Sequence, residues 1–268
     1  MKKKLTIIAM GTFVLLASCT RSEVTPDVRT ITLSARAESG MTRASVNGTT
    51  GAFAWEAGDV IAVHLTTGYQ NATLTANGTT TLTAPASSER DGYAIFPATA
   101  SAAGGTADAP VITLPDSYTI AADLQSESSP LPMVAVNDPD SDILYFHHVG
   151  GLMRIIVSSV PAGTKAVTVT LETEAPIRGI AGSFTVSGPT TSAPTIAPAG
   201  TGTMVSFTVS DEGLASVISN VVLNLPVPVG TYKKLTVNVI PENSVFPVVI
   251  TSDMTIGRAE GLKVMVTP

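Results

Sequence analysis

Short segments in which apolar and polar residues alternate recur along most of this chain. Segment 30–36 is a clear example, because Ile31, Leu33 and Ala35 alternate with polar residues. A period of two residues puts alternate side chains on opposite faces of an extended chain and predicts a half-buried β-strand. Similar segments predict further strands at 60–65, 72–75, 93–96, 111–114, 131–136, 152–157, 166–171, 180–186, 204–209, 221–225, 235–240, 245–250 and 262–266.

Helical periodicity is weak by comparison, and the best candidate for a short helix is 211–219. Only 13% of the residues are charged, and few strong helix formers are present. The strands fall into two blocks, and a turn rich in Pro and Asp at 137–142 lies between them. This arrangement predicts an all-β fold of two tandem antiparallel sandwiches, at 44–142 and 143–268.

The N-terminus carries a different pattern. Three lysines at positions 2–4 precede an uncharged apolar run at 5–16, which is shorter than the roughly 20 residues that a membrane-spanning helix needs. The run predicts a signal peptide over residues 1–18. It ends in Leu-Ala-Ser-Cys, which resembles the lipobox of bacterial lipoproteins, so Cys19 is the predicted lipidation site and would carry acyl chains, palmitate among them. The alternative is an ordinary secretory signal with an incidental cysteine.

Composition narrows the possible partners. Loss of residues 1–18 removes three lysines and takes the formal charge from −6 to −9, without any cluster of Lys and Arg. An acidic chain of this kind is not expected to bind nucleic acid. Cys19 is the only cysteine, which excludes an internal disulfide and favours the lipid site.

Motifs for catalysis are missing from the sequence. It has no G-x-S-x-G elbow, no phosphate-binding Gly-rich loop followed by Lys and Ser or Thr, and no recognisable pair of catalytic carboxylates. The chain is therefore expected not to be an enzyme and to need no cofactor. His147 and His148 are neighbours that would point to opposite faces of a strand, and His64 lies on another strand, so sheet-surface histidines are expected rather than a metal site.

Two local patterns leave alternatives open. Asp138, Asp140 and Asp142 have the alternate spacing of a calcium loop, but an EF-hand would continue with Gly and Glu where Ile143 and Val149 stand, so an acidic turn is the simpler interpretation. Trp55, the only tryptophan, is interpreted as a core residue, and the alternative is a platform for a sugar ring.

Landmarks spread along the chain resemble one family. Thr42-Arg43-Ala44, the motif F-x-W-x-x-G-D-x-I-x-V at 53–63, the motif F-H-H-V-x-x-L-x-R-I-x-V at 146–157 and the segment P-V-G-T-Y-K-K-L-T-V at 228–237 occur in the order found in fimbrillin-like proteins, the type V pilus subunits of the Bacteroidetes. Together with the lipobox they identify a resemblance over nearly the whole chain after residue 18.

The resemblance implies two transthyretin-like domains and a lipidated precursor on the surface of the outer membrane. It further implies a pilus subunit, and since the chain shows no extra strand after 262–266, an accessory, anchor or tip position is favoured over the shaft. An Arg-specific protease would cut after Arg43, or alternatively Arg36, and would release residues 19–43 as tether, propeptide and first strand. Ile31, Leu33 and Ala35 of that strand would then be exchanged for a strand of another pilus subunit.

The implied partners are other pilus subunits, the outer membrane through the lipid, and a ligand on a host or bacterial surface. Alternatively, Arg43 is an exposed turn residue that is never cut. A second function class, a monomeric surface lipoprotein that binds glycan, is less favoured because aromatic residues make up only 5% of the chain.

Overall fold

The computed structural model describes residues 27–38, 55–101, 105–120, 124, 131–209 and 212–268. These residues form strands joined by turns, with one 3₁₀ turn, η1 (Ala98–Ala100), and no α-helix among them, so the predicted all-β fold is confirmed. Within this described part of the chain, no helix has the length and apolar character needed to cross a membrane.

The short helix predicted at 211–219 is wrong for the residues described there. Gly213 adopts a positive φ of 76°, and strand β14 begins at Ile218. The N–H of Leu214 donates to the carbonyl of Thr164, and its carbonyl accepts from the N–H of Gly163. Backbone groups that a helix would pair internally are therefore used to dock this segment on a neighbouring turn.

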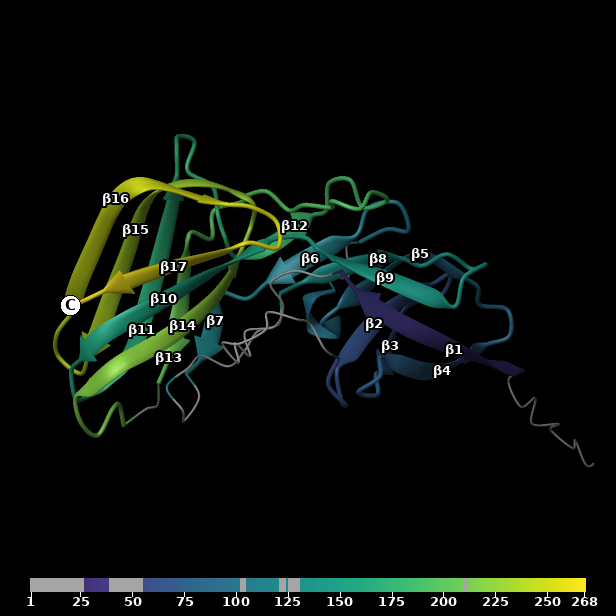
Figure 1. Cartoon of the computed structure of the whole chain (residues 1–268), viewed down its shortest axis with the longest axis horizontal. Coiled ribbons are helices and arrows are strands. Elements are labelled where there is room, and N and C mark those ends of the chain that lie inside the picture. Colours follow the sequence, from purple (N-terminus) through teal and green to yellow (C-terminus); the bar gives the residue numbers. More distant parts are fainter. Residues whose placement is uncertain (1–26, 39–54, 102–104, 121–123, 125–130, 210–211) are drawn as a thin grey trace, which may run out of the picture.

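The N-terminal half is built on one seven-stranded sheet with the order β3-β2-β5-β8-β9-β1-β4. Its strands are β1 (Val28–Ala37), β2 (Val60–Leu65), β3 (Gly68–Thr73), β4 (Thr79–Pro85), β5 (Arg90–Phe96), β8 (Met133–Val136) and β9 (Ile143–His148). Figure 1 shows this half on the right, with β1 running across it in purple.

The two edges of this sheet meet because the sheet curls strongly. Gln70 in β3 donates its side-chain amide to the carbonyl of Thr83 in β4 over 2.6 Å, and the hydroxyl of Thr80 donates to the carbonyl of Thr73 over 2.6 Å. The inward face encloses a core to which all seven strands contribute. β1 and β4 are therefore buried on their inward faces only.

The C-terminal half contains two sheets that share one core. A three-stranded sheet has the order β14-β10-β17, and a five-stranded sheet has the order β16-β15-β11-β13-β7. Their strands are β7 (Ser117–Thr119), β10 (Gly151–Val160), β11 (Thr164–Thr173), β13 (Met204–Thr208), β14 (Ile218–Val227), β15 (Gly230–Pro241), β16 (Phe246–Ile256) and β17 (Gly261–Val266). Apolar residues of β10, β14 and β17 and those of β11, β13 and β15 belong to a single buried cluster.

A two-stranded sheet of β6 (Val111–Leu114) and β12 (Gly182–Thr185) lies between the halves (Figure 1). Ile112 and Phe184 from this pair belong to the same buried cluster as Ala62, Ile95 and Val134, which lie on the outward face of the seven-stranded sheet.

Sheet membership also shows where the chain crosses between the halves. β7 precedes β8 and β9 in the sequence but pairs with β13, in the C-terminal half. β9 follows residue 142, the predicted end of the first sandwich, yet pairs with β8 and β1 in the N-terminal sheet. After His148 the chain enters β10 of the C-terminal half, and β12 later returns to the sheet between the halves.

Candidate strand-exchange site

β1 occupies an interior position in the seven-stranded sheet although it is its first strand in sequence. Residues 28–34 pair antiparallel with β4, and residues 34–37 pair parallel with β9. The N–H of Ser34 donates to the carbonyl of Asp142, and the N–H of Ala35 donates to the carbonyl of Gly78. β1 thus joins two strands, β9 and β4, that have no direct pairing with each other.

The predicted apolar stripe of β1 faces the core. Leu33 is 1% exposed and Ala35 is 3% exposed, whereas Thr32, which lies between Ile31 and Leu33, is exposed. Ile31 is half-buried and packs against the same cluster. The structure therefore brings Ile31, Leu33 and Ala35 together on one face, as the alternation predicts.

Trp55 holds the C-terminal part of β1 against this core. Its indole N–H donates to the carbonyl of Ala35 over 2.8 Å, and its ring packs edge-on against Phe96 and Phe146, with centroids 5.1 Å and 5.5 Å away. Gly78 lies so close that a Cβ there would fall 2.5 Å from the Ala35 carbonyl oxygen. The interpretation of Trp55 as a core residue is confirmed, and position 78 has no room for a side chain beside the Ala35 carbonyl and the indole ring.

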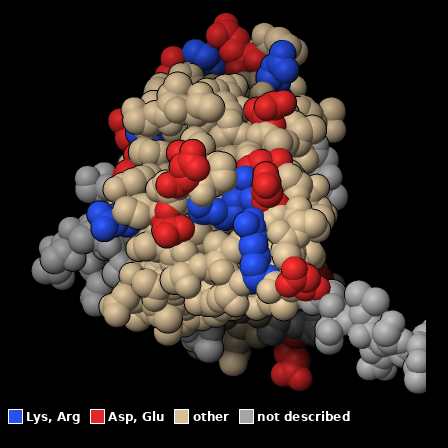
Figure 2. Space-filling model, turned by 90° about the vertical axis from the view of Figure 1, so that its right-hand side faces the viewer, with Lys and Arg blue, Asp and Glu red and all other residues tan. Residues whose placement is uncertain are grey.

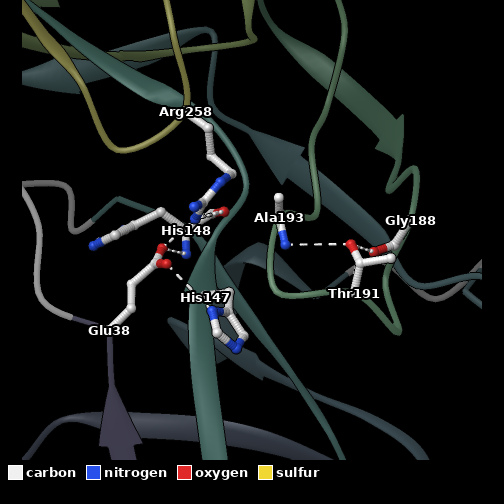
Figure 3. A network of polar contacts seen from close by, with 7 residues as sticks. All are labelled: Glu38, His147, His148, Gly188, Thr191, Ala193 and Arg258. Atoms are coloured by element: carbon white, nitrogen blue, oxygen red, sulfur yellow. Dashed lines mark hydrogen bonds and ion pairs between the residues drawn. The ribbon is translucent and has the colours of Figure 1, made fainter.

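Glu38 fixes the C-terminal end of β1 to both halves of the molecule (Figure 3). Its carboxylate accepts hydrogen bonds from the backbone N–H of His148 over 2.6 Å and from the guanidinium of Arg258. The His147 Nδ1 lies 3.2 Å from the second carboxylate oxygen. Burial raises the pKa of the Glu38 carboxyl, but these three hydrogen bonds outweigh burial and leave its pKa below the ordinary value.

His147 and His148 point to opposite faces of β9, as predicted, but the expectation that all three histidines lie on sheet surfaces is wrong for His148. Its side chain is fully buried, and neither ring nitrogen has a hydrogen-bond partner within the part of the chain that the structure describes. Desolvation therefore lowers the pKa of His148 to about 4. His64 lies elsewhere, with its Nδ1 2.6 Å from a carboxylate oxygen of Asp91. Among the described residues no group of three potential ligands could hold a metal ion.

The acidic turn after β8 is organised by a buried arginine. One terminal nitrogen of Arg90 donates to the carbonyls of Asp138, Pro139 and Ser141, over 2.7, 3.0 and 2.7 Å. A guanidinium therefore lies where the carbonyl oxygens of a calcium loop would bind the ion, which favours the acidic-turn interpretation.

The N-terminal part of β1 passes along an open cleft of about 580 Å³ beside this turn. Arg29 and Thr32 of β1 line it, together with Arg90, Asp140 and Asp142. Seen from this end, the molecule shows a stripe of basic side chains flanked by acidic ones (Figure 2). On this side residues 28–33 have no β9 partner, so the edge of β1 is open there.

The remaining predicted site residues divide into two groups. Cys19 and Arg43 lie outside the described residues. Arg36 is described: it is exposed on β1, is paired with Tyr145 of β9, and its guanidinium lies 5.9 Å from the centre of the Tyr145 ring. Glu38 and Arg258 do not stand out in the sequence, because their contact joins residues 220 positions apart.

Comparison with known proteins relates the fold, but not the sequence, to solved structures. No protein-family model matches the chain, and no curated protein matches it. The crystal structure of a candidate cell adhesion protein from Bacteroides ovatus is similar, with a TM-score of 0.53 and 14% identity over 89% of this chain and 92% of that one. At this level of identity the likeness establishes a shared fold.

Candidate cell adhesion proteins from two other species align over similar lengths but superpose less well. The protein from Bacteroides thetaiotaomicron gives a TM-score of 0.35 at 12% identity over 88% of this chain and 92% of that one. The protein from Bacteroides fragilis gives 0.39 at 11% identity over 88% of each chain.

Proposed function

We propose that this protein is a fimbrillin-like surface adhesin or pilus subunit, in an accessory, anchor or tip position, that assembles by β-strand exchange. It would be exported, anchored in the outer membrane through Cys19, and matured by cleavage after Arg43. The observation that carries the proposal is the interior position of β1, whose neighbours β9 and β4 pair only through it.

The place of β1 in the chain makes it removable. It is the first strand of the sheet in sequence and lies between the predicted lipid site and Arg43, so one cut after Arg43 detaches the strand together with the lipid. Removal leaves unpaired backbone groups on β9 and β4 above an apolar stripe. Such a gap is a template for another extended strand.

Arg43 is favoured over Arg36 as the cleavage site. Arg36 lies inside β1, where the strand is paired with β9. A protease needs an extended substrate whose backbone is free to bind in its own active site, so cleavage at Arg36 would first require β1 to leave the sheet. Cleavage at Arg36 would also leave Glu38 on the subunit.

Two further features, the fold of the two halves and a structural neighbour, support a role at the cell surface. The facing sheets of the C-terminal half suit a transthyretin-like sandwich, and the curled N-terminal sheet supplies the second domain of the proposed pair. The shared fold with a candidate cell adhesion protein of Bacteroides ovatus supports adhesion as the process.

The proposal is tested on lipoprotein extracted from cells and trimmed with an Arg-specific protease. We expect an N-terminus at Ala44, SDS-resistant ladders in unheated gels, and a change in the emission of Trp55, which packs on β1. The variant Arg43→Ala should stay uncut and monomeric, whereas Arg36→Ala should behave like the unaltered protein. Trimmed protein that remains monomeric would contradict strand exchange, and a blocked N-terminus at Cys19 on surface protein would contradict maturation.

A second candidate, glycan binding, is favoured by one cleft. A space of about 390 Å³ lies between β9 and residues 189–192, and Tyr145, 53% exposed, lines it. Thr191 stabilises this loop by donating its hydroxyl to the carbonyl of Gly188 and accepting from the N–H of Ala193 (Figure 3). Loss of binding to a glycan array in Tyr145→Ala, with ladder formation unchanged, would assign the cleft to ligand binding.

A further inference from the structure

We infer that the groove under β1 ends in a carboxylate-binding site, formed by the backbone N–H of His148 and the side chains of Arg258 and His147, and that an incoming strand must bring a carboxylate to it. The inference rests on the proposed function and states what the partner strand must contain. In the uncut chain Glu38 supplies the carboxylate.

The donors converge from two parts of the fold. His147 and His148 end β9, and Arg258 lies in the turn between β16 and β17 (Figure 3). Arg258 also lies 3.3 Å from the carbonyl oxygen of His148, to which it donates. This second bond holds the guanidinium at the end of β9 independently of Glu38.

All three donors remain on the subunit when β1 departs. Cleavage after Arg43 removes Glu38 with the strand, and it leaves a backbone N–H without its acceptor and a guanidinium without its carboxylate. Unpaired polar groups at a partly buried position are costly, and a charged donor more so than a neutral one. The vacated site therefore favours a strand that restores the acceptor over one that fills only the apolar stripe.

The chemistry of the site selects a carboxylate. The His148 N–H and the guanidinium can only donate, and the site carries a positive charge from Arg258. Both donors reach the same oxygen of Glu38, so a carboxylate differs from an amide in its charge, which compensates that of Arg258, and in its second oxygen, which lies beside the His147 Nδ1.

The spacing on β1 completes the description of the partner. Inward residues occur at alternate positions, Ile31, Leu33 and Ala35, and the carboxylate follows three residues after the last of them. The last inward residue is expected to be small, because Ala35 is 3% exposed in the core and a larger side chain there would overpack it. The expected partner strand runs parallel to β9. Over eight residues it has apolar side chains at the first and third positions, a small one at the fifth and an acidic one at the eighth.

The test uses detergent-extracted full-length protein, trimmed with an Arg-specific protease and mixed with labelled peptides of residues 28–43. The peptide with Glu38→Gln should dissociate about ten- to hundredfold faster than the native peptide, as expected for the loss of charge-assisted hydrogen bonds. A peptide with Ala37→Glu and Glu38→Gln keeps the net charge and should behave like the Gln peptide. On Arg258→Gln protein, the native and Gln peptides should differ by less than about threefold.

The outcomes distinguish failure of the carboxylate-binding site from failure of strand exchange. If both peptides enter the groove and dissociate at the same rate from unaltered protein, strand exchange stands and the carboxylate site is overturned. If no peptide enters, the proposed function fails, and the site is tested in the uncut chain. There Glu38→Gln and Arg258→Gln should lower the urea midpoint non-additively, and additive effects would overturn the carboxylate site as well.

Discussion

The indole N–H of Trp55 binds the carbonyl of Ala35 at the point where β4 no longer accompanies β1. The bond satisfies a backbone acceptor that lies in the core. Replacement by phenylalanine keeps an aromatic ring but leaves this carbonyl unpaired, so Trp55→Phe should lower the free energy of unfolding by about 1–3 kcal/mol. Urea denaturation followed by circular dichroism measures the loss. Tyr145→Phe, at an exposed ring, should change it by less than about 0.5 kcal/mol; equal losses would contradict the role of the bond.

The two faces of β1 should respond differently to truncation. Leu33 is buried in the N-terminal core and Thr32 is exposed beside it. Leu33→Ala should cost about 2–5 kcal/mol of stability, whereas Thr32→Ala should cost less than about 0.5 kcal/mol. Limited proteolysis at Arg36 reports the same difference locally, because a loosened β1 exposes its backbone. A similar cleavage rate in the two variants would argue against β1 being held by its apolar stripe.

A fall in pH should lower the free energy of unfolding, because the buried ring of His148 takes up a proton only when the chain unfolds. The pKa of this buried ring is lowered to about 4 from an ordinary 6.5, so the unfolded chain binds a proton between these values and the folded chain does not. Stability is therefore complete above about pH 6.5 and falls as the pH drops toward 4, by about 3 kcal/mol in all. Glu38 acts in the same sense at lower pH, because its lowered pKa stabilises the fold until that carboxylate is protonated.

Substitution of His148 isolates its part of this pH dependence. His148→Phe removes two buried nitrogens that lack partners in the described structure and keeps the backbone N–H that binds Glu38. We expect the variant to be about 1–3 kcal/mol more stable at neutral pH and to lose most of the decline between pH 6.5 and 4.5. Tyr145→Phe, at a ring that is 53% exposed on the same strand, is the control and should leave the decline in place. Thermal unfolding in a pH series would reveal either result.

Arg90 should stabilise the acidic turn more than an added cation does. Its guanidinium binds three carbonyls of residues 138–141, so Arg90→Met should cost about 2–4 kcal/mol by leaving those acceptors unpaired. A chelator should leave the Tm of the unaltered protein unchanged. A calcium-dependent rise in Tm that is lost in both Asp138→Asn and Asp140→Asn would instead assign a cation site to this turn.

The alternation of apolar and polar residues was enough to predict most strands, because a half-buried strand has one apolar face and one polar face. It missed β4, where Thr80 stands on the buried face among other threonines, and β9, where His148 takes a position that an apolar residue would mark. The three-residue β7 is too short to show a period.

The candidate site was predicted only in its local part. Ile31, Leu33 and Ala35 follow from the period of one strand, and Trp55 was recognised as core. The donors around Glu38 could not be foreseen, because one is a backbone N–H and another, Arg258, lies in a turn with no pattern of its own. Sheet order also depends on long-range pairing, which hydrophobic periodicity does not encode.

The ion pair between Glu38 and Arg258 spans 220 positions, which is most of the polypeptide. Closing so long a loop is entropically unfavourable and slow compared with forming local hairpins. The turn between β16 and β17, which carries Arg258, must also have been synthesised before the contact can form. We therefore expect this end of the first strand to be secured late in folding, after most of the chain has folded.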